Sequence, residues 1–376
     1  MSNKNNFDNL DTLVVSGGGI KSIAALGSLK VLEEKGILKN IKKYAGTSAG
    51  GIIVSLLVIG YTPDEINELI FSKIGSYTNE SLYKIPCNMI YNYGIYSGDK
   101  MISFLEGFFE KKSYSKKITF KELYERTNKI LVMTGTSLSI RDTIFFNYQT
   151  TPNLEVIKAI RITASIPLYF TSVRYLHEEK EHLMCDGGVL SNFPLYYFDY
   201  FKTITTTDGI NGGINKDLDE NEEKFKLKVN KIQENVNERI STEKILYSSF
   251  NELYRNKNKI SKIKIKNVRN KDIQYNVIGI LLLGENENRD TEKFFTGFNV
   301  ISNLKEYITC FLETLLKKIE QDNFLNPLTG TKANFFDKTI TIITPPEISI
   351  IKFNLTKKEN DKLIHTGIQS TIEFFS

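Results

Sequence analysis

The sequence is poor in cysteine and lacks long hydrophobic runs, and both absences limit what the protein can be. Its three cysteines, Cys87, Cys185 and Cys310, have neither the spacing of a metal site nor that of a redox motif. Free thiols in a reducing compartment are therefore expected. The longest apolar runs, residues 52–59 and 277–283, are far shorter than the roughly 20 residues of a membrane-spanning helix. Any membrane contact is expected to be peripheral.

The segment from Met1 to Asp11 is polar and has no apolar h-region, so no conventional secretory signal is expected. We expect a cytoplasmic or peripheral membrane location, or a host-cell location if the protein is a viral or bacterial effector. The net charge of +5 is modest for this length and would favour an anionic membrane surface over a neutral one. No nucleic-acid motif accompanies this charge, so no nucleic-acid partner is expected.

What the chain does contain is a glycine loop between a short strand and a helix. Residues 12–15 are apolar, Gly17, Gly18 and Gly19 follow, and apolar residues then recur at helical spacing. Successive glycines allow backbone N–H groups to point into one concavity, and the helix N-terminus adds its positive dipole end. The loop therefore suits a phosphate or an oxyanion, with a purely structural turn as the alternative. A dinucleotide site is weakly supported because Ser22 stands where its third glycine is required.

A second strand–turn–helix pattern surrounds Ser48. Residues 41–45 form a strand candidate, and the apolar run 52–59 is helix-like. Gly46 and Gly50 leave room for a strand to turn sharply into a helix, which lifts Ser48 clear of the backbone as in a nucleophile elbow. A serine hydroxyl is a weak nucleophile, so a base and an oxyanion site must lie elsewhere. Two such units in succession indicate a parallel α/β core.

Asp186 is the candidate base. It lies in Cys185-Asp186-Gly187-Gly188, where the glycines allow a tight turn that exposes one side chain. Taken alone, this sequence is a common turn. The case for a site depends on the combination of Asp186 with the glycine loop and Ser48.

Four short motifs follow one another along residues 9–200. They are Gly17-Gly18-Gly19-Ile20-Lys21, Gly46-Thr47-Ser48-Ala49-Gly50, Ser165-Ile166-Pro167, and Asp186-Gly187-Gly188 followed by Asn192 and Pro194. Each motif is weak alone, but the ordered and spaced set resembles the patatin-like phospholipases. Ser22 stands where that family commonly has glycine, and this larger residue is expected to alter the close approach of the turn slightly.

This resemblance implies both a fold and an activity. The expected fold is a three-layer α/β/α arrangement with a mostly parallel central sheet and a charged insertion. The expected reaction is hydrolysis of fatty acyl esters of phospholipids or lysophospholipids by a Ser–Asp dyad, without a metal or other cofactor. By position, Ser48 matches the nucleophile and Asp186 the dyad aspartate. The positions expected to form the oxyanion hole are Gly17, Gly18, Gly19 and Ala49. Lys21 either contacts a phosphate or the oxyanion, or is a solvated lysine.

A triad that includes histidine is the main alternative, because α/β-hydrolases use serine, aspartate and histidine in that chain order. The sequence has three histidines. His177 and His182 lie in a charged run that is expected to be a solvated hairpin, and His365 is expected on a surface helix capped by Thr356. The dyad is therefore favoured, and His365→Ala is expected to keep most activity.

No repeat or linker divides the chain, so we expect one patatin-like domain over residues 9–376. Its motif-bearing core spans 9–200, residues 273–376 complete it, and residues 208–272 form a densely charged insertion. The basic stretch 255–271 could engage anionic headgroups or nucleic acid, but a solvated arm is the more ordinary interpretation.

The remaining patterns predict the elements around these motifs. Residues 75–96 are rich in tyrosine, asparagine and glycine and are expected to be irregular, whereas 300–320 has the spacing of a long amphipathic helix. Further helices are expected over 62–74, 98–110 and 153–163, after Thr119 and after Thr356. Further strands are expected over 129–137, 142–148, 202–207, 275–283 and 338–343.

Two functions of other classes remain open. One is a lipid-surface binding or host-interacting protein whose hydrolase site is incidental or needs a protein activator. The other is an acyltransferase, in which an alcohol replaces water as the acceptor of the acyl group.

Overall fold

The computed structural model describes residues 10–78, 80–177, 179–195, 197–198, 276–284 and 338–376. The chain divides into two compact units, one formed by Met1–Pro194 with Arg269–Ser376 and the other by Leu195–Val268. The first unit contains all the elements discussed below. Three predicted segments lie outside the described residues: the strand over 202–207, the charged insertion over 208–272 and the helix over 300–320.

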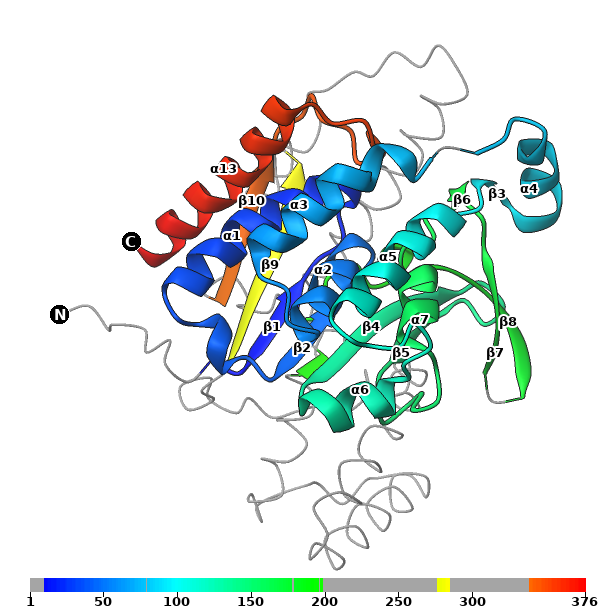
Figure 1. The fold of residues 1–376 in the computed structure, drawn as a ribbon, viewed down its shortest axis with the longest axis horizontal. Helices are drawn as coiled ribbons and strands as arrows, with labels where there is room; N and C mark the ends of the chain where they lie inside the picture. Colours follow the sequence, from blue (N-terminus) through cyan, green and yellow to red (C-terminus); the bar gives the residue numbers. More distant parts are fainter. Residues whose placement is uncertain (1–9, 79, 178, 196, 199–275, 285–337) are drawn as a thin grey trace, which may run out of the picture. The chain divides into compact units, whose positions relative to one another are not determined.

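An eight-stranded sheet forms the centre of the first unit, in the order β10-β9-β1-β2-β4-β8-β7 with β5 paired to β4 (Figure 1). The strands are β1 Thr12–Val15, β2 Lys43–Gly46, β4 Ile130–Ser137, β5 Asp142–Phe146, β7 Val173–His177, β8 Lys180–Asp186, β9 Val277–Gly284 and β10 Thr339–Thr344. The strands from β10 through β4 pair in parallel. Strands β5, β8 and β7 add antiparallel pairs at one side. The sheet is therefore mostly parallel, as predicted.

Strand β1 has a partner on each side, which explains its composition. Thr12 is paired with Lys43 of β2 and with Val277 of β9. All 4 residues of β1 are buried, and a continuous apolar run is typical of a parallel strand covered on both faces. The carboxyl end of this central strand leads directly into the glycine loop.

The helices follow the expected ranges closely. They are α1 Ile23–Glu34, α2 Ala49–Val58, α3 Pro63–Lys73, α5 Asp99–Lys111, α6 Phe120–Thr127, α7 Val156–Thr163 and α13 Lys357–Phe375. In Figure 1, α1 and α2 lie across the strands and α13 runs beside α1. Helices α1 and α13 approach closely at glycines: a Cβ on Gly27 would lie 2.0 Å from the Ile364 carbonyl oxygen, and one on Gly367 would lie 1.8 Å from that of Ala24.

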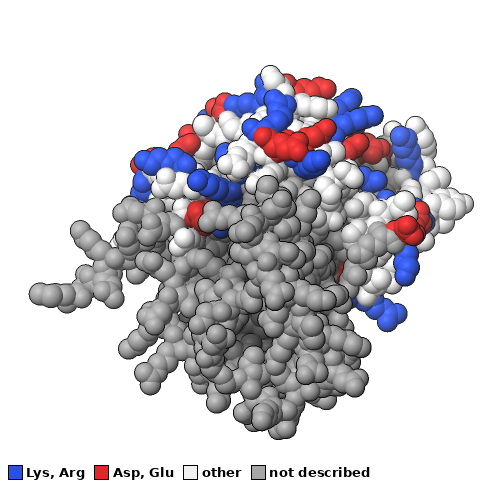
Figure 2. Space-filling view, turned by 90° about the horizontal axis from the view of Figure 1, so that it is seen from below, with Lys and Arg blue, Asp and Glu red and all other residues white. Residues whose placement is uncertain are grey.

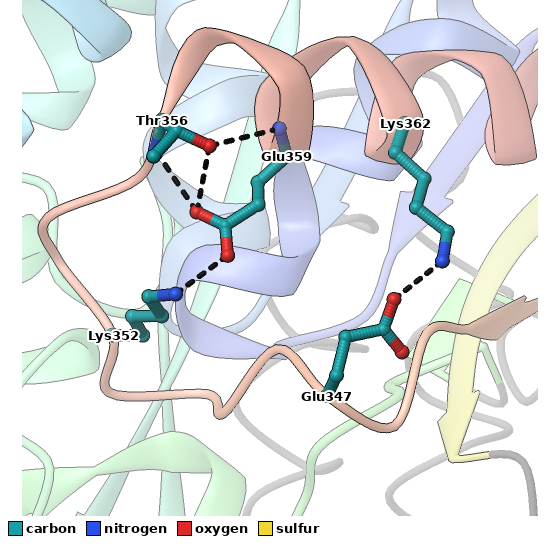
Figure 3. Close-up of polar contacts among 5 residues, drawn as sticks. All are labelled: Glu347, Lys352, Thr356, Glu359 and Lys362. Carbon is teal, nitrogen blue, oxygen red and sulfur yellow. Dashed lines mark hydrogen bonds and ion pairs between the residues drawn. The ribbon is translucent and has the colours of Figure 1, made fainter.

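Polar contacts hold the loop between β10 and α13 (Figure 3). Glu359 accepts a hydrogen bond from the Thr356 N–H at 2.9 Å, and its own N–H donates to Thr356 Oγ1 at 3.3 Å, which forms the predicted capping box. Glu359 also pairs with Lys352 at 2.5 Å. One turn further along α13, Lys362 pairs with Glu347. The start of the last helix is thereby tied to a loop that contributes to the site described below.

The expectation that residues 75–96 are irregular is wrong. They include helix α4, Lys84–Asn92, and strand β3, Gly94–Tyr96, which pairs in parallel with β6, Leu168–Phe170. Figure 1 shows α4 at the edge of the unit, away from the central sheet. Most apolar side chains of α4 are exposed, so the helix lacks the core-facing spacing from which helices are predicted.

The charged run around His177 and His182 forms the predicted hairpin, β7–β8. The expectation that its histidines are solvated is wrong, because they are only 8% and 5% exposed. Alternation along each strand places both rings on the covered face of the hairpin. There, His182 Nδ1 is hydrogen-bonded to Ser137 Oγ at 2.9 Å. His365, in contrast, is exposed on α13 as predicted.

Candidate active site

Ser48 occupies the turn between β2 and α2. Its φ of +53° lies in the left-handed region, which is strained for a residue with a side chain. A Cβ on Gly46 would lie 2.6 Å from the Gly50 carbonyl oxygen, and one on Gly50 would lie 2.5 Å from that of Ser16. Neither position can bear a side chain without moving the backbone. The geometry of the turn therefore requires both glycines of the predicted elbow.

Ser48 and Asp186 are in direct contact. The Ser48 hydroxyl donates a hydrogen bond to Asp186 Oδ2 at 2.6 Å, and the two residues are 6% and 4% exposed. The Ser48 N–H donates to Thr163 Oγ1 at 2.9 Å. Within the described part of the chain, no histidine is hydrogen-bonded to Ser48 or Asp186.

The end of β8 and the turn after it position Asp186. The N–H of Asp186 donates to the Ser165 carbonyl oxygen at 2.9 Å, which joins two of the sequence motifs. The Gly188 N–H donates to Asp186 Oδ1 at 2.7 Å. A Cβ on Gly187 would lie 2.1 Å from Thr134 Oγ1, so the turn after Asp186 has no room for a side chain there.

Burial makes Asp186 a stronger base than an ordinary aspartate. Desolvation raises its pKa from 3.8 to about 7, although the hydrogen bonds from Ser48 and the Gly188 N–H act in the opposite direction. A proton acceptor is most effective when its pKa lies close to the working pH. The environment of Asp186 therefore suits proton transfer near neutrality.

The glycine loop lies directly beside Ser48. A Cβ on Gly17 would lie 3.1 Å from Ser48 Cβ, and the Gly17 N–H donates to the Asn192 carbonyl oxygen at 3.2 Å. Beside Ser48, the backbone N–H groups of Gly18, Gly19 and Ala49 donate no hydrogen bond to another described residue. These N–H groups can therefore receive a ligand oxygen, whereas that of Gly17 is already bonded.

Buried hydroxyl groups connect the elbow with the neighbouring strand. Thr47 Oγ1 is hydrogen-bonded to Thr134 Oγ1 at 2.7 Å and donates to the Ser191 carbonyl oxygen at 2.9 Å. No sequence pattern predicts a role for Thr134, Thr163 or Ser191, because an isolated serine or threonine gives no signal in a single sequence. Only their nearness to a motif, as for Ser191 after Asp186, could have drawn attention to them.

Ser48 lies on the wall of an apolar pocket. The lining includes Ile23, Ile52, Ile70, Met101, Phe170 and Phe353. Phe353 stacks on Tyr169 with ring centroids 5.5 Å apart. Phe353 was not predicted as a site residue, since it lies in the loop before α13, far from every motif. A pocket with a hydrocarbon lining suits an apolar ligand such as an acyl chain.

Lys21 and Ser22, which follow the glycine loop, differ in their relation to this pocket. Lys21 does not line it. The pKa of Glu347 is lowered by its hydrogen bond from Lys362 and, to a smaller extent, by the charge of Lys21. Ser22 does line the pocket and is 1% exposed, and its hydroxyl has no hydrogen-bond partner among the described residues.

Among the described residues, no group of three or more histidine, cysteine, aspartate or glutamate side chains is placed to hold a metal ion. In the same residues, every helix is too short or too polar to cross a membrane. Figure 2 shows acidic and basic side chains interspersed over the described part of one face, and no extended area of a single charge sign is visible among these residues.

Comparison with known proteins agrees with the motifs. The model of the patatin-like phospholipase family matches residues 13–199. With the mostly parallel sheet described above, this match confirms the predicted three-layer α/β fold.

Similar proteins come from viruses, bacteria and fungi. The chain is 35% identical over 190 residues to the probable lipid hydrolase 463L of Invertebrate iridescent virus 6, an alignment that covers 49% of this chain and 61% of that protein. It is 33% identical over 196 residues to the uncharacterised protein YqhO of Bacillus subtilis, covering 49% of this chain and 65% of YqhO. Each alignment thus spans less than two thirds of the relative. Among solved structures, VipD from Legionella pneumophila matches with a TM-score of 0.46 and 15% identity, covering 98% of this chain and 67% of VipD.

Proposed function

Because the chain belongs to the patatin-like phospholipase family, we propose that it is a lipid acyl hydrolase in which Ser48 and Asp186 form the catalytic dyad. The substrate class is the fatty acyl esters of phospholipids or lysophospholipids. The observation that best supports this proposal is the 2.6 Å hydrogen bond between the Ser48 hydroxyl and Asp186, at the wall of an apolar pocket.

In the first half of the reaction, Asp186 accepts the proton of the Ser48 hydroxyl while Ser48 Oγ attacks the ester carbonyl carbon. Negative charge then develops on the carbonyl oxygen. The N–H groups proposed to stabilise it are those of Gly18, Gly19 and Ala49, and removal of one such donor typically costs about 3 to 4 kcal/mol. The tetrahedral intermediate collapses, the ester C–O bond breaks, and the leaving alcohol takes the proton from Asp186.

In the second half, water attacks the acyl group on Ser48 and Asp186 accepts the proton that the water loses. The bond between Ser48 Oγ and the acyl carbon breaks, the fatty acid leaves, and Ser48 regains its proton from Asp186. Among the proposed oxyanion residues, Gly17 acts by shaping the loop, since its N–H is bonded to Asn192. Lys21, outside the pocket, remains a candidate contact for a headgroup phosphate.

The extent of the domain and the location of the protein are also proposals. We infer that one domain spans residues 9–376, with residues 208–272 as its insertion. We infer further that the protein acts at a membrane surface without spanning it, and that it needs neither a metal nor another cofactor.

Fatty-acid release from mixed phospholipid vesicles, in the presence of a metal chelator, tests the proposal. Wild type is expected to release fatty acid, whereas Ser48→Ala and Asp186→Asn are expected to be inactive. Ser55→Ala is the matched control, because Ser55 is a buried serine of helix α2, which follows Ser48, and its hydroxyl donates to the Gly51 carbonyl oxygen, outside the pocket. His365→Ala is expected to keep most activity.

Equal release by wild type and Ser48→Ala would contradict the proposed nucleophile. Loss of activity in a folded His365→Ala protein would favour the histidine triad over the dyad. No release by folded wild type would favour a partner-activated enzyme or a lipid-binding protein. Transfer of the acyl group to an added alcohol, faster than to water, would indicate an acyltransferase.

A further inference from the structure

An exposed apolar surface lies on residues 81–96, which we name the α4 arm. Its most exposed large side chains are Leu82 at 84%, Tyr83 at 76%, Tyr91 at 69% and Ile90 at 66%. Single exposed apolar residues are normal on a protein surface, but a group of them marks a site of interaction. We therefore expect a binding partner that buries the apolar side chains of the arm.

The composition of the arm favours a lipid surface as the binding partner. Between Ser81 and Gly98 the only charged residue is Lys84. Tyrosine, which joins an apolar ring to a polar hydroxyl, is enriched where hydrocarbon meets water, and the arm contains Tyr83, Tyr91, Tyr93 and Tyr96.

The distribution of exposed residues around α4 also favours a lipid surface. Met89, Ile90 and Tyr91 are consecutive, and all three are exposed, at 45%, 66% and 69%. Consecutive residues on a helix are about 100° apart, so these side chains cover a wide arc of it. A partner helix would cover one narrow stripe, whereas a lipid surface can surround a helix on several sides.

The arm is joined directly to the wall of the pocket. Strand β3 of the arm pairs with β6, with Tyr96 opposite Phe170, and Phe170 lines the pocket. The Ser172 N–H donates to the Asn92 carbonyl oxygen at 2.8 Å, which ties the end of α4 to the chain after β6. A surface that receives the arm therefore lies close to the wall of the pocket.

We propose that the α4 arm docks on the surface of a phospholipid bilayer and holds the pocket against the layer from which acyl chains enter. This inference rests on the proposed function, since the substrate of a lipid hydrolase is part of that surface. Docking is mainly apolar, because the arm has a single charge, so it depends little on salt or on the fraction of anionic lipid.

The absence of tryptophan from the chain allows a direct test. In a Ser48→Ala background, which leaves the lipid intact, Ile90→Trp introduces one fluorophore on the arm. Ile372→Trp is the matched control, since Ile372 is 47% exposed on α13. With phosphatidylcholine vesicles, the emission of Ile90→Trp is expected to shift to shorter wavelength and to be quenched by brominated acyl chains. The Ile372→Trp emission is expected to stay unchanged.

A second test uses the active protein. Replacement of Leu82, Tyr83, Ile90 and Tyr91 by glutamine is expected to reduce hydrolysis of vesicles about tenfold or more while hydrolysis of a monomeric short-chain ester stays unchanged. The control replaces Leu176, 68% exposed on the β7–β8 hairpin, together with Ile372, and is expected to act on vesicles like wild type.

Three outcomes would overturn the docking proposal. They are an unchanged Ile90→Trp emission with vesicles, an equal shift of Ile372→Trp, and a shift without vesicles that grows with protein concentration, which would indicate a second copy as the occupant. If wild type hydrolyses neither substrate, the proposed function fails, but the fluorescence experiment still decides the docking proposal.

Discussion

At the scale of single residues, the site depends on backbone strain and on burial. The positive φ of Ser48 is maintained because Gly46 and Gly50 allow β2 and α2 to approach more closely than side chains would permit. Asp186 is nearly inaccessible to water, and this burial rather than a neighbouring charge raises its pKa. Both features can be tested by changes that leave the surrounding packing in place.

Activity is expected to depend on the ionisation of Asp186. Its pKa is raised to about 7 and only the carboxylate accepts the Ser48 proton, so kcat/KM should fall about tenfold for each pH unit below that value. A pH profile on a monomeric ester measures this. A profile flat from pH 5 to pH 8 would contradict the assignment of Asp186 as the base.

The stability of the fold is expected to depend on the same group. It should fall as the pH rises, whereas activity increases. Between pH 3.8 and about 7 the folded protein retains a proton on Asp186 that the unfolded chain releases, so this group lowers stability as the pH rises. Asp186→Asn removes the effect. The free energy of unfolding of Asp186→Asn minus that of wild type should therefore increase from pH 4 to pH 8, by an amount on the order of 4 kcal/mol. Denaturant unfolding at each pH measures the difference.

Ser22 provides a second prediction at this scale. Its buried hydroxyl has no partner among the described residues, so Ser22→Ala should stabilise the fold by about 1 kcal/mol. Ser28 of the adjoining helix α1 is the matched control, because its buried hydroxyl donates to the Gly367 carbonyl oxygen at 3.1 Å. Ser28→Ala should destabilise by a similar amount. Equal destabilisation by both changes in thermal unfolding would contradict the description of Ser22 as unpaired.

At the scale of elements, Arg161 of α7 joins the α4 arm to the site. It donates to the Ser97 carbonyl oxygen at 2.7 Å and to the Thr171 carbonyl oxygen at 2.8 Å, and it also bonds to Ser165 Oγ. Ser165 in turn accepts the hydrogen bond from the Asp186 N–H. One guanidinium therefore connects the segment after β3, the segment after β6 and the turn that precedes β6.

Arg161→Lys tests this connection, because an ammonium group cannot reproduce the planar fork of donors. It should destabilise the fold by about 2 kcal/mol and lower kcat for a monomeric ester. Arg174→Lys is the matched control, since the Arg174 pair with Glu181 is exposed, and its effect should stay below about 1 kcal/mol. Similar unfolding curves for the two variants would contradict a structural role for Arg161.

At the scale of the whole molecule, the sequence predicted features with a strong local cause. The glycine motifs and the buried β1 run are local patterns, and their positions in the fold are as expected. Helix α4 was missed because its apolar residues face outward. Phe353 could not be predicted as a pocket residue, because only tertiary packing brings it to α2 and β6. The burial of His177 and His182 was missed because the charged residues between them dominate the local pattern.

The central claim is that Ser48 is a nucleophile made reactive by Asp186. Reaction with a fluorophosphonate, followed by mass spectrometry of the intact protein and its peptides, tests it most directly, since a reactive serine displaces fluoride and keeps the phosphonyl group. We expect one adduct on Ser48 in wild type and Ser55→Ala, much slower labelling in Asp186→Asn, and none in Ser48→Ala. An adduct on another residue, or equal labelling rates in wild type and Asp186→Asn, would contradict it.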